Sequence, residues 1–106
     1  MQQFHISNMT GGWFVGDFSP VAYRTKATEV AFKEYKAGDS EPSHHHREAV
    51  ELTMVAYGTV QMNGLVLNQG DIVLVEMHES VAFKALTDAA TVVVKTPSVP
   101  GDKYPD

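Results

Sequence analysis

The sequence predicts an all-β domain, either a sandwich or a small barrel, and three observations support this fold class. Short segments rich in valine, threonine and aromatic residues recur along the chain. Glycine, proline, asparagine and aspartate separate these segments at intervals of about ten residues, a spacing typical of sandwiches and barrels. No segment carries a convincing apolar stripe of helical period.

Length and composition indicate one small domain over residues 1–106, with an N-terminal segment at 1–12 and a C-terminal tail at 97–106. The formal charge is −5, and the 8 lysines and arginines are scattered, so we expect no nucleic-acid partner. The chain has no cysteine, no secretory signal and no apolar run near the roughly 20 residues of a membrane span. We therefore expect a cytoplasmic protein that does not enter membranes.

The first two predicted strands lie over 13–18 and 28–37. The segment 13–18 is short, aromatic and expected at a sheet edge. In the segment 28–37, Val30 and Phe32 share one face while Tyr35 lies on the other, which is the alternation of a strand. A helix is conceivable there, but these residues form no clean stripe of period 3.6.

The remaining strands are predicted over 50–57, 59–62, 65–67, 72–75, 81–86 and 91–95. Asn63 and Gly64 both accept positive φ, so they predict a tight hairpin between the second and third of these segments. The all-apolar run 72–75 predicts a strand covered on both faces. The tail after Pro97 is interrupted by proline and glycine, and we expect either an ordered wrap or a loose end.

The stretch 38–58 carries the chemistry of the chain. His44 and His46 are two residues apart, so on a strand both point to one face, while His45 points to the other and is expected to be exposed. Glu51 follows five residues after His46, an odd separation that would reverse its direction on one unbroken strand. Convergence of the three side chains therefore requires a bend or a change of strand between them. Two imidazoles and a carboxylate form a facial ligand set for a divalent transition metal.

The spacing of Gly38, His44, His46, Glu51 and Gly58 is similar to the complete first motif of the cupins. The resemblance implies a jelly-roll β-barrel (a double-stranded β-helix), often dimeric, with Fe, Mn, Ni or Zn inside the barrel. It also implies that His44, His46 and Glu51 are metal ligands. The alternative to metal binding is that the histidines belong to an exposed histidine-rich loop and that Glu51 occupies a solvent-facing position on a strand.

The second cupin motif is only half present. The chain begins it at Gly70 and then departs from it: Glu76 replaces the proline, His78 the glycine, Val81 the histidine and Ala85 the asparagine. The family's fourth ligand is therefore missing, because valine does not bind a metal. Three protein ligands can still hold an ion with open positions for water or substrate.

Further pocket candidates follow from position alone. Glu76 and His78 are the nearest replacements for the missing ligand, although a polar turn explains them equally simply. The aromatic and hydroxyl candidates, which are as readily explained as core residues, are Tyr35, Thr53, Tyr57 and Phe83. Trp13 and Phe14 suit either a dimer interface or the core.

Three functions remain open at this point. We expect a small homodimeric cupin that binds a divalent metal inside the barrel and a small polar, sugar-like ligand, with catalysis undecided. The amino-acid sequence of residues 11–14, 29–38 and 92–104 is also similar to that of small cupins encoded with polysaccharide and sugar-nucleotide genes. The alternatives are a metal-dependent cupin enzyme of the oxygenase or isomerase type and a metal-free sugar-nucleotide isomerase or epimerase.

Overall fold

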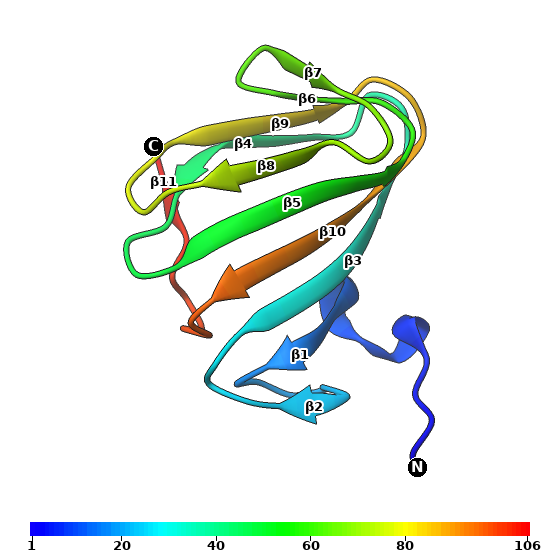
Figure 1. Cartoon of the computed structure of the whole chain (residues 1–106), viewed down its shortest axis with the longest axis vertical. Helices are drawn as coiled ribbons and strands as arrows, with labels where there is room; N and C mark the ends of the chain where they lie inside the picture. Colours follow the sequence, from blue (N-terminus) through cyan, green and yellow to red (C-terminus); the bar gives the residue numbers. More distant parts are fainter.

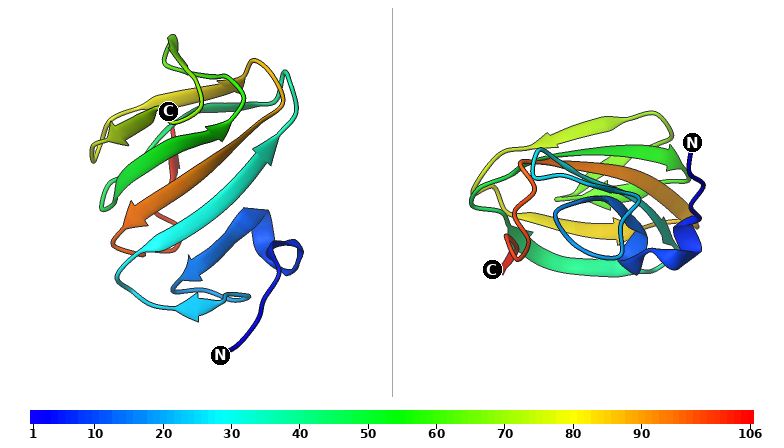
Figure 2. Two further views of the ribbon diagram at one scale, coloured as in Figure 1. Left: turned by 45° about the vertical axis from the view of Figure 1, so that its right-hand side comes forward. Right: turned by 90° about the horizontal axis from the view of Figure 1, so that it is seen from below.

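The computed structural model describes the whole chain, residues 1–106, as eleven β-strands and two short 3-10 helices (Figure 1). The helices are η1 (Ile6–Asn8) and η2 (Thr10–Gly12). A six-stranded sheet has the order β2-β1-β3-β10-β5-β8, with β1 (Trp13–Gly16), β2 (Tyr23–Arg24), β3 (Glu29–Tyr35), β5 (Val50–Tyr57), β8 (Ile72–Val75) and β10 (Ala89–Thr96). A five-stranded sheet has the order β11-β4-β9-β6-β7, with β4 (Ser40–His45), β6 (Val60–Met62), β7 (Leu65–Leu67), β9 (Val81–Ala85) and β11 (Tyr104–Pro105). The two sheets face each other and enclose the interior (Figure 2).

The all-β prediction is confirmed, and so are the strands expected over the second half of the chain. Strand β5 has the predicted bounds, and the predicted hairpin joins β6 to β7. Its two turn residues, Asn63 and Gly64, have φ values of 49° and 81°, the left-handed conformation that the sequence indicates. No helix of the structure is long and apolar enough to cross a membrane.

Two details of the sequence prediction were wrong. Strand β1 is not at an edge, because it pairs with β3 on one side and with β2 on the other. Strand β8 is not covered on both faces, since Ile72 is 63% exposed and Leu74 is 51% exposed. β8 is the last strand of its sheet, and no element of the chain lies over its outer face.

The apolar core occupies the part of the barrel formed by β5 to β9 and the start of β10. Its members are buried residues of both sheets: Val55, Val60, Met62, Leu67, Val75, Val81, Phe83, Ala85 and Ala89. Gly58 allows the chain to turn tightly at this end, with φ at 81°. A Cβ atom there would lie 2.2 Å from the carbonyl oxygen of Asp88. The motif glycine is therefore required by close backbone approach.

The inner face of the six-stranded sheet is polar where the core ends. Strand β10 lies between β3 and β5, and its Lys95 is opposite Glu29 on one side and Glu51 on the other. Residues directly opposite in an antiparallel pair have Cβ atoms about 5 Å apart. The three charged side chains therefore form one row across the interior, which would be costly without compensating partners.

The C-terminal tail is an ordered wrap. Strand β11 pairs with β4, placing Tyr104 opposite His45. The segment before it runs from the end of β10 in one sheet, along the left-hand side of the barrel in Figure 1, to β4 in the other sheet. The end of the chain therefore lies against β4, where the tail contacts His45 and the bend after β4.

Candidate functional site

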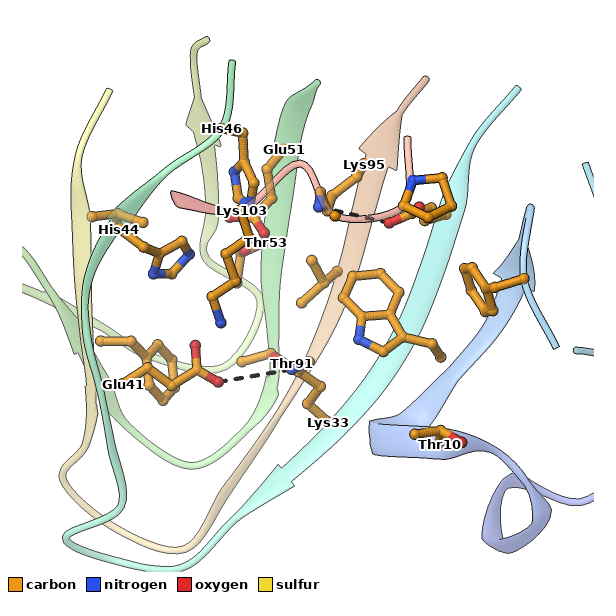
Figure 3. A pocket seen from close by; sticks show the side chains of 18 of the residues that line it. Thr10, Lys33, Glu41, His44, His46, Glu51, Thr53, Thr91, Lys95 and Lys103 are labelled. Carbon is orange, nitrogen blue, oxygen red and sulfur yellow. Dashed lines mark ion pairs between the residues drawn. The ribbon is translucent and has the colours of Figure 1, made fainter. Parts of the chain in front are cut away.

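A cavity of about 370 Å³ lies between the sheets on the open side of the barrel (Figure 3). The structure brings most of the predicted site residues into its wall, namely His44, His46, Glu51, Tyr35, Thr53 and Phe83. The other three predicted pocket residues lie outside it. Tyr57 is 41% exposed on the far end of β5, and Glu76 and His78 are exposed in the turn between β8 and β9. No side chain of that turn replaces the missing fourth ligand in the cavity wall.

The two motif histidines are buried and face the cavity. Both are less than a tenth exposed, and their ring centroids lie 5.2 Å apart in an edge-to-face arrangement. The Nδ1 atom of His44 lies 3.1 Å from the carbonyl oxygen of Pro42, so Nδ1 carries the proton and donates it. That hydrogen bond leaves Nε2 of His44 with a free lone pair, the usual state of a metal-binding imidazole.

His46 is neutral at physiological pH. Burial first, and then the positive charge of Lys95 and the neighbouring His44, lower its pKa to about 4. A neutral imidazole has a lone pair that can bind a metal or accept a proton. Sequence alone could not establish this state, because Lys95 is distant in the chain.

His45 points away from the cavity, as the alternation predicts, but it is not an isolated exposed residue. Its Nδ1 lies 2.7 Å from Oδ1 of Asp106, and its ring stacks on Tyr104 with centroids 5.6 Å apart. It therefore fastens the end of the tail to β4.

The bend required between His46 and Glu51 exists, and Asp102 holds it. β4 ends at His45 and β5 begins at Val50 in the opposite sheet, so His46 lies just after the end of β4 and Glu51 lies on β5, with the change of sheet between them. The Asp102 carboxylate accepts hydrogen bonds from three successive backbone N–H groups of the bend, at 2.8, 3.1 and 2.9 Å: those of Arg47, Glu48 and Ala49. Burial alone would raise the pKa of Asp102, but these bonds together hold it below its ordinary value.

Glu51 is the carboxylate of the site, and a lysine lies next to it. Burial raises the pKa of Glu51, and the positive charge of Lys95 partly offsets this effect. Lys95 also lies 3.6 Å from Oε1 of Glu29, while Oε2 of Glu29 accepts a hydrogen bond of 2.9 Å from Ser98. The row Glu29–Lys95–Glu51 thus contains two carboxylates and one buried ammonium group.

The remaining polar wall of the cavity comes from β3 and β4. Lys33 lies 3.7 Å from Oε1 of Glu41, which also accepts a hydrogen bond of 3.3 Å from the Tyr35 hydroxyl. Burial first, and then the charge of Glu41, raises the pKa of Tyr35, so the phenol stays protonated. The hydroxyl of Thr91 is buried and has the Tyr35 hydroxyl nearby, but it makes no hydrogen bond.

Trp13 forms the aromatic wall between the lysines. Its ring centroid lies 5.4 Å from Nζ of Lys33 and 5.9 Å from Nζ of Lys95, within the range of cation–π attraction. The sequence prediction assigned Trp13 to an interface or the core, and it did not select the charged cavity residues Glu29, Lys33 and Lys95. The available signal was the placement of Glu29, Lys33 and Lys95 on the inward, alternating positions of otherwise apolar strands.

The donor set suits a divalent transition metal in its chemistry. His44 and His46 offer neutral imidazoles, and Glu51 offers a buried carboxylate, which together match a facial triad. The structure holds no group of three or more histidine, cysteine, aspartate or glutamate side chains already arranged to hold an ion. Closing the three donors on one ion therefore requires their side chains to rotate toward a common point, and Lys95 must tolerate a second cation nearby.

Comparisons with known proteins show the fold. No protein-family model and no curated protein matches the chain. A double-stranded β-helix protein from Klebsiella pneumoniae is 23% identical, with 73% of this chain and 69% of that chain covered and a TM-score of 0.66. An RmlC-like cupin from Desulfovibrio desulfuricans is 20% identical over 71% of this chain and 76% of that chain, with a TM-score of 0.63. The bacterial pirin YhhW from Escherichia coli, solved in complex with nickel(II), is 14% identical over 82% of this chain and 39% of that chain, with a TM-score of 0.67.

The chain thus has the double-stranded β-helix fold of the cupins, as its first motif indicates. The similar structures include the nickel(II) complex of YhhW and one cupin described as a sugar phosphate isomerase. These descriptions belong to the proteins concerned, and this chain resembles them in fold.

Proposed function

We propose that the cavity binds a divalent transition metal (Fe, Mn, Ni or Zn) on His44, His46 and Glu51, together with a small polyhydroxylated ligand. The observation that carries the proposal is the burial of two imidazoles and one carboxylate around a single polar cavity. The pirin YhhW, solved with nickel, supports a metal in a barrel of this shape. When bound, such an ion would act as a Lewis acid toward a ligand oxygen.

The rest of the cavity wall suits a sugar-like ligand. The carboxylate of Glu41 and the hydroxyl of Thr91 line the cavity as hydrogen-bond acceptors for a ligand, Lys33 lines it as a donor, and the Trp13 ring offers an apolar face for C–H groups. A few placed polar groups around an aromatic wall are typical of small-molecule sites, and the volume lies at the lower end of their usual range of about 300–1,000 Å³.

A metal-free isomerase or epimerase is the second candidate, and the placement of Tyr35 and His46 in one cavity supports it. The Tyr35 hydroxyl donates to Glu41 in the same cavity as the neutral His46. Such chemistry requires an acid and a base on opposite sides of a bound substrate. His46 would then act as the base and Tyr35 as the acid.

The outer face of the six-stranded sheet supports the homodimer expected from the sequence. Four apolar side chains of β5 and β8 are between 37% and 63% exposed there: Leu52, Met54, Ile72 and Leu74. Contiguous apolar surface of this kind is typical of protein interfaces. A second copy of the chain would cover it without blocking the cavity, which lies on the other face of the sheet.

Trp13 gives a direct test of the metal proposal because it is the only tryptophan of the chain and lines the cavity. Titration with Mn²⁺, Ni²⁺ or Zn²⁺ should change its fluorescence with a stoichiometry of about one ion per chain. His46→Ala should weaken the response at least about tenfold, in line with the loss of one ligand. His5→Ala, which removes an exposed histidine outside the metal group, should leave it unchanged. An equal response in His46→Ala and the wild type would contradict the assignment.

A further inference from the structure

Lys95 lies between two buried carboxylates and forms an ion pair with only one of them. The register of β10 places it directly opposite Glu29 on β3 and directly opposite Glu51 on β5, so backbone register alone favours neither partner. Nζ of Lys95 lies 3.6 Å from Oε1 of Glu29, whereas Glu51 takes part in none of the ion pairs of the structure. Contacts other than the strand pairing therefore draw the ammonium group toward β3.

Two contacts on the β3 side of β10 explain this choice of partner. Oε2 of Glu29 accepts a hydrogen bond of 2.9 Å from the hydroxyl of Ser98, which fixes the carboxylate with its other oxygen toward Lys95. The ring centroid of Trp13, on β1, lies 5.9 Å from Nζ of Lys95, within the range of cation–π attraction. Because the strand order is β1-β3-β10-β5, both contacts hold the ammonium group away from Glu51.

Glu51 is left as a cavity carboxylate without an ion pair. It is only 9% exposed, and its side chain extends into the cavity beside Lys95 (Figure 3). A carboxylate that already held an ammonium group would have to lose that ion pair before it could bind a metal ion, and the two cations would repel each other at short range. Retention of Lys95 by Glu29 therefore keeps the Glu51 oxygens available.

We propose that Glu29 is a positioning residue for the metal site: it retains the ammonium group of Lys95, so that Glu51 stays free to bind a divalent metal ion. This proposal rests on the metal site proposed above and adds to it a residue that does not touch the ion. The Glu29–Lys95 pair carries no net charge, so it also limits the repulsion that an unpaired Lys95 would exert on a dication.

The test measures the affinity of the full chain for Ni²⁺ and for Zn²⁺ by titration calorimetry. In Glu29→Gln, the glutamine keeps an oxygen for the hydrogen bond from Ser98 but loses the charge that holds Lys95. The ammonium group should then pair with Glu51, and the affinity for both metals should fall at least about tenfold. The double variant Glu29→Gln/Lys95→Met should regain an affinity within about threefold of the wild type, because no ammonium group is left to occupy Glu51.

The rescue by Lys95→Met separates positioning from a merely structural role of Glu29. Circular dichroism verifies that each variant is folded before titration. If Glu29→Gln does not fold, Ser98→Ala takes its place: it keeps both charges, releases one oxygen of Glu29 and should weaken metal binding about threefold. Glu34→Gln, the same substitution at an exposed position of β3, is the matched control and should leave the affinity unchanged.

The outcomes distinguish the positioning role from the metal site itself. A wild type that binds metal no more tightly than Glu29→Gln, or than Ser98→Ala where that variant is used, overturns the positioning role and leaves the metal site standing. A double variant that binds as weakly as Glu29→Gln overturns it as well, since Glu29 would then act without Lys95. If neither the wild type nor the double variant binds Ni²⁺ or Zn²⁺, the proposed metal site fails together with the positioning role.

Discussion

Replacing Lys95 with methionine should lower the free energy of unfolding by about 3 kcal/mol, because it leaves Glu29 as an uncompensated charge in the interior. The side chains of Lys95 and Glu29 are only 9% and 7% exposed, so water cannot solvate the remaining carboxylate well. Methionine keeps the length and most of the apolar volume of lysine, which limits the loss of packing. Urea denaturation followed by circular dichroism measures the effect.

The double variant Glu29→Gln/Lys95→Met separates charge from packing. Removing both charges should restore at least about half of the lost stability, since a neutral pair carries no desolvation penalty of an isolated ion. The glutamine also keeps an oxygen that accepts the hydrogen bond from Ser98. A double variant as unstable as Lys95→Met would show that the lysine acts by packing alone.

Replacing Asp102 with asparagine should cost about 3 kcal/mol of stability at neutral pH. The amide retains one acceptor oxygen, and its NH₂ group meets backbone N–H groups that have lost their carboxylate partner. Hydrogen bonds to charged groups contribute about 1.5–3 kcal/mol each, and a donor left unsatisfied adds a penalty. Because Asp102 holds the bend between His46 and Glu51, the variant should also bind metal more weakly. Asp39→Asn, an exposed carboxylate of the β3–β4 turn, is the matched control.

The same carboxylate gives the fold a dependence on acid pH. The pKa of Asp102 is below its ordinary value of 3.8 in the folded chain, so its contribution is fully present above about pH 4 and is lost as pH falls through the folded pKa. In Asp102→Asn this component should be absent. Unfolding midpoints that fall equally steeply below pH 4 in both proteins would contradict the role given to Asp102.

Much of the fold could be predicted because local sequence patterns determine it. Strand β5 alternates over its full length, and Asn63–Gly64 selects a hairpin by backbone conformation alone. The positions of His44 and His46 also follow from alternation, which the structure confirms by burying both. The error at β8 has the same origin, since an apolar run indicates burial but cannot say which element or which second chain provides the cover.

The charged half of the site could not be predicted, because it depends on pairings between distant segments. Glu29 and Lys95 meet only through the register of β3 with β10, and Asp102 reaches the bend that begins at Arg47 only because the tail crosses from one sheet to the other. Each of these residues alone resembles an ordinary surface charge. The sequence does not show that these residues are buried. Their burial places lysines in the cavity beside the candidate metal ligands.

Elemental analysis of the untagged protein, purified without a nickel column, tests the central claim most directly. The wild type should carry about one equivalent of a transition metal per chain, and His46→Ala purified in parallel should carry less than about a tenth of that amount. The result that contradicts the account is a wild-type protein that contains no metal and takes up none after incubation with Fe²⁺, Mn²⁺, Ni²⁺ or Zn²⁺. The cavity would then be a metal-free site, in which His46, Tyr35 and Glu41 remain to be tested as acid–base groups.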